Sequence, residues 1–473
     1  MPTAGPMPRR GEAGVVIQYA MLAGPLLSML DSSVVNVAAE PIARSLHASL
    51  GTVQWTISGY LLALGTGLAG TACLARRFGT LAVYRTSLVA FTAASLLCAV
   101  APGIGALIGC RAVQGLVAAP LVPLGMSMLL GKSGQARSVS PVAGILLFAA
   151  PAFGPTVGGA LIGAAGWRLI FAINVPFGVA ASWAARRLPE GASRNRSGKS
   201  EFDLFGLALL AAGLLLLLLG TSEGGGGWDS VACLGPLVAG AALLAAYVLW
   251  ASRRVRPALD LSLARRPVAA LSMGLCALAS VVTWAAVFLL PVFVQSVQGR
   301  SALAAGVAMA PQGLVTGLST ALGARVLVRF TVRSTVCCGF CVLGAASLLV
   351  EVVGAGTPLW VVSLILAARS ASIGLIISPL LAALTGPLPP ERMGDASTLF
   401  NVVNRVAGSF GIGLLASLYA VLARSAGGPV YALHVSGIVI ACVAGLGAVA
   451  ALALPAVANM SVLGGARGGA RTR

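Results

Sequence analysis

The sequence predicts an all-α membrane protein that crosses the bilayer fourteen times. Three observations support this prediction. Of the 473 residues, 58% are hydrophobic and only 9% are charged, whereas about a quarter of the residues in a soluble protein carry charge. Apolar runs of about 20 residues recur along the chain, and each is long enough to cross a hydrocarbon core of about 30 Å as a helix. Short basic loops separate these runs.

The fourteen predicted spans divide into six, two and six. We expect a cytoplasmic tail at 1–14, an N-terminal six-helix bundle at 15–185, two lipid-facing linker helices with basic loops at 186–267, a C-terminal six-helix bundle at 268–456 and a cytoplasmic tail at 457–473. Two such halves around a midplane site are typical of secondary transporters. The spans are expected near 15–37, 51–72, 81–101, 103–130, 138–163, 168–185, 203–220, 231–250, 268–295, 302–322, 334–352, 358–382, 397–423 and 432–456.

The net charge of +19 follows this topology. With the N-terminus inside, 24 of the 31 Lys and Arg residues fall in or beside cytoplasmic segments, 4 fall outside and 3 fall within spans, a bias that the positive-inside rule predicts. Both termini are then cytoplasmic, and the first span is expected to be retained because it is too long for a cleaved signal peptide. The distribution of charge argues against a nucleic-acid partner. The basic residues expected outside are Arg44, Arg168, Arg300 and Arg424.

The sequence indicates no cofactor, no metal site and no enzyme. The nine cysteines are scattered through the spans, and the only two histidines, His47 and His434, lie near outer helix ends. A membrane enzyme would need a nucleophile with its base, or paired acids near the membrane face. Scarce carboxylates and isolated histidines make such a site improbable.

Span five carries an unusual run of helix breakers and small residues. Backbone groups in lipid must stay hydrogen-bonded, so prolines there are tolerated only where neighbouring helices compensate. Small residues at four-residue spacing also let two membrane helices approach closely. We therefore expect a bent helix packed tightly against a partner; plain packing without a further role is the alternative. The residues concerned are Pro151, Gly154, Pro155, Gly158 and Gly159.

Two ionisable residues inside the first bundle are candidates for proton chemistry. Asp31 is the only acid well inside the first six spans, and Arg111 lies on span four. Their depths in the bilayer differ by roughly 7 Å, which an Arg side chain can reach. A buried Arg keeps its charge and biases the ionisation of a nearby acid, so the pair could act as a proton switch. A static ion pair that locks two helices is the alternative.

Aromatic, amide and basic side chains on other spans are candidates to line a substrate cavity. A mostly apolar cavity with few polar groups suits an amphipathic organic molecule. For any one of these residues, packing is the commoner role. In the second half Arg369 should also face the interior, whereas Glu351 is expected at a solvated helix end. The cavity candidates are Asn36, Gln54, Trp55, Tyr60, Gln114, Trp284, Phe288, Phe293, Gln295, Gln312, Asn401 and Arg405.

Several segments, in order, resemble motifs of the fourteen-span drug:proton antiporters of the major facilitator superfamily. Residues 30–38 resemble the first-span motif, and residues 111–123 resemble the fourth-span motif, in which the family assigns the Arg to proton coupling. Residues 154–159, followed by 167–178, are similar to the fifth-span antiporter motif and its sequel. In the second half, the matching segments are 290–295 and 394–397 with Asn401, Arg405 and Gly408.

The chain departs from the family in the loop between spans two and three. Arg76 stands where the family carries an Asp that helps to latch the cytoplasmic side. The segment Thr80-Leu81-Ala82 also replaces the basic residues that normally follow. The latch is therefore expected to be weaker or built differently.

The resemblance implies the major facilitator fold and proton-coupled efflux of an amphipathic small molecule, such as a drug or antibiotic, by alternating access. The implied partners are the substrate, protons and the lipid bilayer, and we expect a monomer. A composition rich in Ala, Gly and Arg and poor in Lys is typical of GC-rich bacteria, so we expect a bacterial plasma membrane and multidrug or self-resistance. The alternatives are an importer of a small metabolite, which the fifth-span motif disfavours, and a non-transporting sensor or scaffold.

Overall fold

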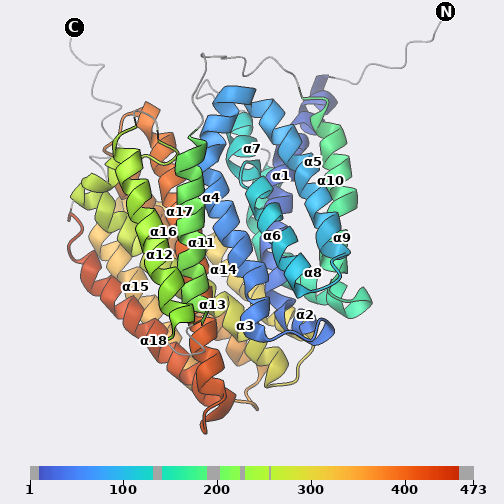
Figure 1. Ribbon diagram of the computed structural model, residues 1–473, viewed down its shortest axis with the longest axis vertical. Helices are drawn as coiled ribbons and strands as arrows, with labels where there is room; N and C mark the ends of the chain where they lie inside the picture. Colours follow the sequence, from blue (N-terminus) through green and yellow to red (C-terminus); the bar gives the residue numbers. More distant parts are fainter. Residues whose placement is uncertain (1–9, 131–140, 189–202, 224–228, 255–256, 457–473) are drawn as a thin grey trace, which may run out of the picture.

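The structure is a computed structural model that describes residues 10–130, 141–188, 203–223, 229–254 and 257–456. Within these ranges the chain forms helices that run roughly along one common axis (Figure 1). The prediction of an all-α protein is therefore confirmed. The predicted C-terminal tail, most of the N-terminal tail and most of the first basic loop lie outside the described residues.

The first half of the chain consists of long helices joined by short ones. α1 continues into a 3-10 turn, η1, and two short helices then lead to the second span. The Ser49 side chain caps the second of these short helices by accepting a 3.1 Å hydrogen bond from the Thr52 amide. The elements are α1 (Arg10–Val34), η1 (Val35–Val37), α2 (Ala39–Ser45), α3 (Leu50–Val53), α4 (Trp55–Phe78), α5 (Thr80–Ala99), α6 (Ile104–Ala118), α7 (Leu121–Leu130), α8 (Pro141–Ala165), α9 (Leu169–Ala172) and α10 (Asn174–Ala185).

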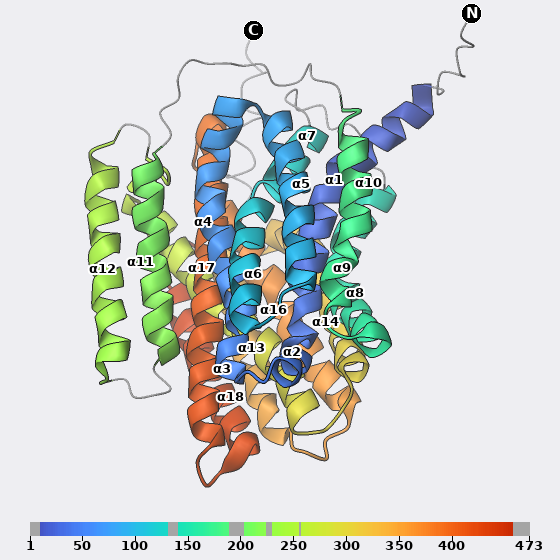
Figure 2. The same ribbon diagram turned by 45° about the vertical axis from the view of Figure 1, so that its right-hand side comes forward.

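The two central helices, α11 (Leu204–Glu223) and α12 (Val231–Ser252), stand beside the rest of the molecule, and Figure 2 shows them as a separate pair at one side. α11 contacts α4 and α17, whereas α12 packs mainly on α11. Large apolar side chains of α12 are exposed, including Val231 and Val238. An apolar surface of this kind suits contact with lipid.

The second half contains longer helices than the first. A short 3-10 helix, η4 (Leu261–Arg265), leads into it from α12. The elements of the second half are α13 (Pro267–Ser296), α14 (Ala302–Arg329), α15 (Val332–Leu348), η5 (Leu349–Val352), α16 (Leu359–Thr385), α17 (Pro390–Ala423) and α18 (Gly428–Ala451).

The observed helices are compatible with fourteen spans. Among the described residues, 12 helices are long and apolar enough to cross a membrane, and one further pair of helices passes the same test together. That pair joins Phe153–Ala165 to Leu169–Ala185 with a bend of 119°. Its two arms coincide with the predicted fifth and sixth spans.

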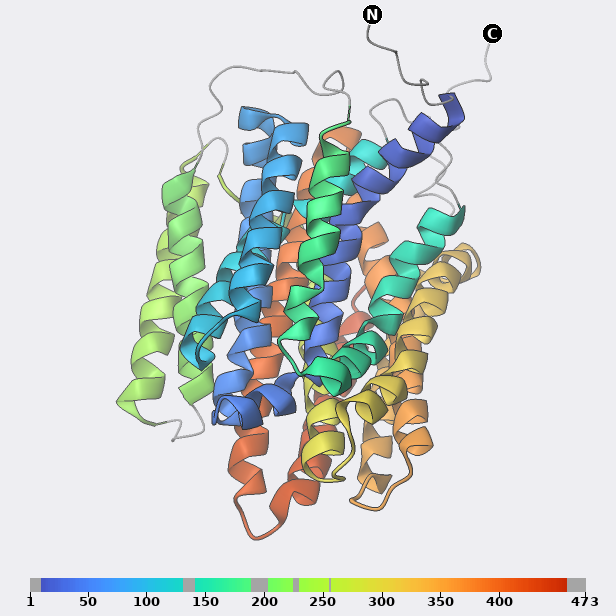
Figure 3. The same ribbon diagram turned by 90° about the vertical axis from the view of Figure 1, so that its right-hand side faces the viewer.

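In the described structure, two pairs of long helices make the most extensive contacts between the halves: α8 packs along α14 (Figure 3), and α4 packs along α17. At the first contact, the Thr156 hydroxyl donates a 3.0 Å hydrogen bond to the Gly306 carbonyl. At the second, the Ser409 hydroxyl donates a 2.8 Å hydrogen bond to the Ser58 carbonyl. A Cβ atom added to Gly159 would strike the backbone of Ala302, so the approach of α8 to α14 requires a residue without a side chain.

We predict that Gly159→Leu destabilises the protein, because its side chain would force α8 away from the α14 backbone. Overpacking of this kind costs typically about 1–3 kcal/mol. Thermal unfolding in detergent should show a lower midpoint for this variant. Gly163→Leu is the matched control, since Gly163 lies one turn further along α8 and a Cβ atom there would enter open space, with no neighbouring atom within 4 Å. Equal midpoints for the two variants would contradict the tight contact.

Candidate functional site

Asp31 on α1 and Arg111 on α6 form a direct ion pair in the interior of the first half. The Arg111 Nη1 atom lies 2.7 Å from the Asp31 Oδ2 atom, and each side chain is only 1% exposed. Asp31 is the only acidic side chain in the described part of the chain that is buried. The two predicted proton-coupling residues therefore meet; their role remains a prediction.

Arg111 is held from several sides. Its Nε atom donates a 3.0 Å hydrogen bond to the Thr56 carbonyl on α4, and Nη1 donates a 2.7 Å bond to the Gln114 side-chain oxygen. The guanidinium carbon lies 3.9 Å from the centre of the Tyr60 ring, which is within cation–π range. Gly115 permits this arrangement, because a Cβ atom there would strike the Tyr60 carbonyl. The sequence thus brings α6 against α4 where the charge is buried.

The carboxylate of Asp31 accepts two further hydrogen bonds at its other oxygen. Asn174 Nδ2 lies 2.9 Å from Oδ1, and Gln114 Nε2 lies 3.2 Å from it. Gln114 also donates a 2.7 Å hydrogen bond to the Ser95 hydroxyl on α5. Four helices (α1, α5, α6 and α10) therefore contribute side chains to one network. Sequence analysis includes Asn174 in the segment 167–178 that resembles a family motif, but it gives neither Asn174 nor Ser95 a role at this site, although an amide at the start of an apolar span was a usable signal.

Two predicted residues in the second half, Gln312 and Arg405, lie near other conspicuous side chains: Gln312 near a basic one and Arg405 near an aromatic one. Gln312 shares a small cavity of about 10 Å³ with Arg369, which is large enough for about one water molecule. Arg405 lies beside Trp284, with its guanidinium carbon 5.4 Å from the ring centre. Arg369 thus lies in the interior of the second half, whereas Arg405 is partly exposed and lies on the side of α17 that faces the first half.

The other predicted cavity residues are dispersed in the described part of the chain. Trp55 and Phe288 line a cavity of about 660 Å³ between α3, α11, α13 and α17. Gln54 donates a 3.3 Å hydrogen bond to the Ser222 hydroxyl on α11, and Gln295 donates a 3.0 Å bond to the Val37 carbonyl. Asn36 and Phe293 are buried, whereas Asn401 is exposed and bonds to the Ser397 carbonyl. The described residues do not bring the predicted set together in one cavity.

The predicted hinge residues lie on α8 where it meets both halves. A Cβ atom on Gly154 would strike the Ser33 hydroxyl on α1, and one on Gly158 would lie 2.8 Å from the Val34 carbonyl. The Pro155 carbonyl lies against Gly306 of α14. Pro151 belongs to α8, but its side chain lies outside the described residues. The tight packing expected of this segment is therefore present, with α1 on one side and α14 on the other.

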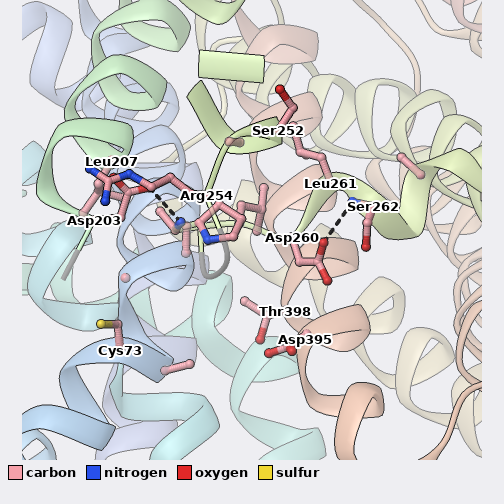
Figure 4. A pocket seen from close by; sticks show the side chains of 18 of the residues that line it. Cys73, Asp203, Leu207, Ser252, Arg254, Asp260, Leu261, Ser262, Asp395 and Thr398 are labelled. Atoms are coloured by element: carbon pink, nitrogen blue, oxygen red, sulfur yellow. Dashed lines mark hydrogen bonds between the residues drawn. The ribbon is translucent and has the colours of Figure 1, made fainter. Parts of the chain in front are cut away.

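A cavity of about 960 Å³ lies between the end of α4, the linker helices and the start of α17 (Figure 4). Arg76, the residue that departs from the family pattern, lines it together with Asp203, Asp260 and Asp395. Asp260 forms a 2.8 Å ion pair with Arg392. Burial raises the pKa of the Asp260 carboxyl, but hydrogen bonds from Ser262 and the Arg392 guanidinium outweigh it and hold the pKa below its usual range. The cavity contains none of the predicted substrate residues.

We predict that Arg111→Met destabilises the protein by about 3–5 kcal/mol, because removing one partner of a buried ion pair leaves the other charge uncompensated. The double variant Asp31→Asn, Arg111→Met should lose less stability than the sum of the single variants. Chemical unfolding in detergent measures both quantities.

The control is Glu40→Gln, which breaks a 2.8 Å ion pair near the surface, where the Arg44 side chain is 69% exposed and the Glu40 side chain is 12% exposed. Such surface pairs contribute about 0–1 kcal/mol. An Arg111→Met variant as stable as Glu40→Gln would contradict the importance of the buried pair.

Comparison with known proteins identifies relatives over most of the chain. The profile of the Major Facilitator Superfamily matches residues 21–412. The multidrug resistance protein B homolog of Mycobacterium tuberculosis is 34% identical over 416 residues, which cover 86% of this chain and 75% of that protein. The methylenomycin A resistance protein of Streptomyces coelicolor is 30% identical and covers 85% of both chains. The multidrug export protein EmrB of Escherichia coli is 28% identical, covering 87% of this chain and 81% of that protein.

A solved structure supports the same fold. A mutant of the nucleoside transporter NupG superposes with a TM-score of 0.65 over 93% of this chain and 99% of that chain, at 11% sequence identity. At this identity the likeness concerns the fold alone. The chain belongs to the Major Facilitator Superfamily, as its motifs predicted, and is a multi-pass transporter of the bacterial plasma membrane rather than an enzyme.

Proposed function

We propose that this transporter exports amphipathic small molecules in exchange for protons by alternating access. The observation that carries the proposal is the buried Asp31–Arg111 pair, because a charge held inside a membrane span is costly and usually functional. Relatives named as multidrug export and resistance proteins support the direction and breadth of transport. An importer finds no comparable support among these relatives.

The pair can couple proton binding to helix movement, because the distance between Asp31 and Arg111 decides which form of the carboxyl group is favoured. While Arg111 lies against Asp31, the positive charge stabilises the ionised carboxylate. If a movement of α6 or α1 separates the two groups, a buried carboxylate without its partner favours the protonated form. Asn174 and Gln114 can hydrogen-bond either form. Proton uptake and release would then follow the relative position of two helices.

Alternating access would use the two seams between the halves. α8 and α14 touch through backbone at Gly159 and Gly306, and α4 and α17 touch near Gly65. Such small-residue contacts let two helices slide or rock without large side chains that must be repacked. We assign the Gly-Pro segment of α8, with Pro151, Gly154, Pro155, Gly158 and Gly159, as the pivot. The protein acts as a monomer with cytoplasmic termini and without a nucleic-acid partner in this proposal.

We predict that Asp31→Asn abolishes transport driven by a pH gradient, because an amide cannot take up and release the coupling proton. The assay is gradient-driven uptake of a panel of amphipathic fluorescent drugs into everted membrane vesicles. Substrate exchange without a gradient should survive, since it needs no net proton movement. Glu40→Gln, the same chemical change in a pair whose basic partner Arg44 is exposed, should leave both activities intact. Undiminished gradient-driven uptake by Asp31→Asn would overturn the coupling role.

We predict that Gly159→Leu reduces export at least tenfold while the protein still inserts in the membrane, because the added side chain blocks movement at the α8–α14 seam. Export and membrane content are measured in the same cells. Gly163→Leu should export normally. Normal export by the Gly159 variant would contradict the role of this α8 segment as a pivot and would favour plain packing instead.

A further inference from the structure

The interior of the second half holds a positive charge that no described residue neutralises. Arg369 on α16 is 5% exposed. Its two terminal nitrogens donate hydrogen bonds to neutral acceptors, 2.8 Å to the Ser347 hydroxyl and 3.1 Å to the Val282 carbonyl. Within the described ranges, it forms no ion pair. Since a guanidinium keeps its charge in a protein interior, this site carries a net positive charge inside the membrane.

Arg405 on α17 adds a second such charge at the seam between the halves. A Cβ atom on Gly65 of α4 would lie 3.3 Å from the Arg405 Cβ atom, which places this side chain where α17 faces the first half. The Arg405 guanidinium carbon lies 5.4 Å from the centre of the Trp284 ring, and Arg405 as a whole residue is partly exposed. The acids in the described part of the chain provide it with no ion pair. A cation on a partly exposed residue thus lies beside an aromatic ring where the two halves meet.

In the first half, by contrast, the buried positive charge has a counter-charge. There the carboxylate of Asp31 balances Arg111 at 2.7 Å, and two amide side chains complete its hydrogen bonds. While the pair is closed, the charge of this buried acid is therefore already balanced by Arg111 and offers little to a cationic ligand. Across the described interior, the guanidinium groups of Arg369 and Arg405 remain without counter-charges. Uncompensated buried charge is strongly unfavourable, so a ligand that supplies a negative charge would be favoured there.

We propose that the exported substrate is an amphipathic anion, in which a carboxylate, sulfonate or phenolate pairs with Arg405 and an aromatic body packs on Trp284. Arg369 strengthens the positive potential, since it bonds to the Val282 carbonyl, two residues from Trp284 on the same helix. This inference rests on the proposed export function and narrows its substrate class. A cationic substrate would meet two like charges and no available buried acid in the described structure.

The test compares three coumarin probes with one scaffold: a sulfonate, its neutral dimethylsulfonamide and a trimethylammonium analogue. Their charges are fixed, so a pH gradient does not redistribute them passively. Gradient-driven uptake into everted vesicles of the parent protein should be at least tenfold faster for the sulfonate than for the other two. Arg405→Gln should reduce sulfonate uptake at least tenfold and change sulfonamide uptake less than twofold. Arg405→Lys should retain most of the preference, because it keeps the charge.

Arg300→Gln is the matched control, since it removes a guanidinium from an exposed loop between α13 and α14. It should leave all three rates within twofold of the parent. Preferred uptake of the cationic or neutral probe, or an unchanged sulfonate preference in Arg405→Gln, would overturn the inference while leaving export intact. Absence of gradient-driven uptake for these probes and for the wider drug panel would overturn the proposed function itself, and this inference with it.

Discussion

The ion pair between Asp31 and Arg111 is the interaction on which the first half depends. Either charge alone would be costly in a lipid-surrounded bundle, because an isolated charge at membrane depth costs about 2.5–3.5 kcal/mol even on the most permissive scales. The network with Gln114, Asn174 and Ser95 satisfies the carboxylate and the guanidinium together. It also fixes α1, α5, α6 and α10 relative to one another. The same network therefore balances the buried charges and holds the four helices in their arrangement.

Small residues solve the complementary problem of bringing helices close enough. In lipid, apolar burial gives no driving force between helices, so close packing and hydrogen bonds hold them together. Gly115 lets α6 reach the Tyr60 backbone, which places Arg111 over the Tyr60 ring. Gly159 and Gly306 likewise bring α8 and α14 into backbone contact between the halves. The glycines thus determine where polar groups can meet.

The sequence predicts the helices well because hydrophobic length and basic loops follow directly from the bilayer. It also predicts the approach of Asp31 to Arg111, since two opposite charges at similar depth have few alternatives. It does not place Asn174 or Ser95 in the same network, because their positions depend on how α5 and α10 rotate against α1. Rotation about a helix axis is determined by packing, which composition does not encode. The dispersal of Gln54, Gln295 and Asn401 has the same cause.

The groups around Arg76 explain why a basic residue fits at this position, where the family pattern has an acid. The family pattern places an acid on this turn, whereas here the carboxylates of Asp203, Asp260 and Asp395 lie on other elements around the same cavity. Asp203 accepts hydrogen bonds from the Trp250 ring and the Ala258 amide, and Asp260 pairs with Arg392. The linker helices therefore contribute polar contacts at this end of the molecule, although their outer faces are apolar. A basic residue on the α4 turn fits this arrangement, because the neighbouring elements supply the negative charge.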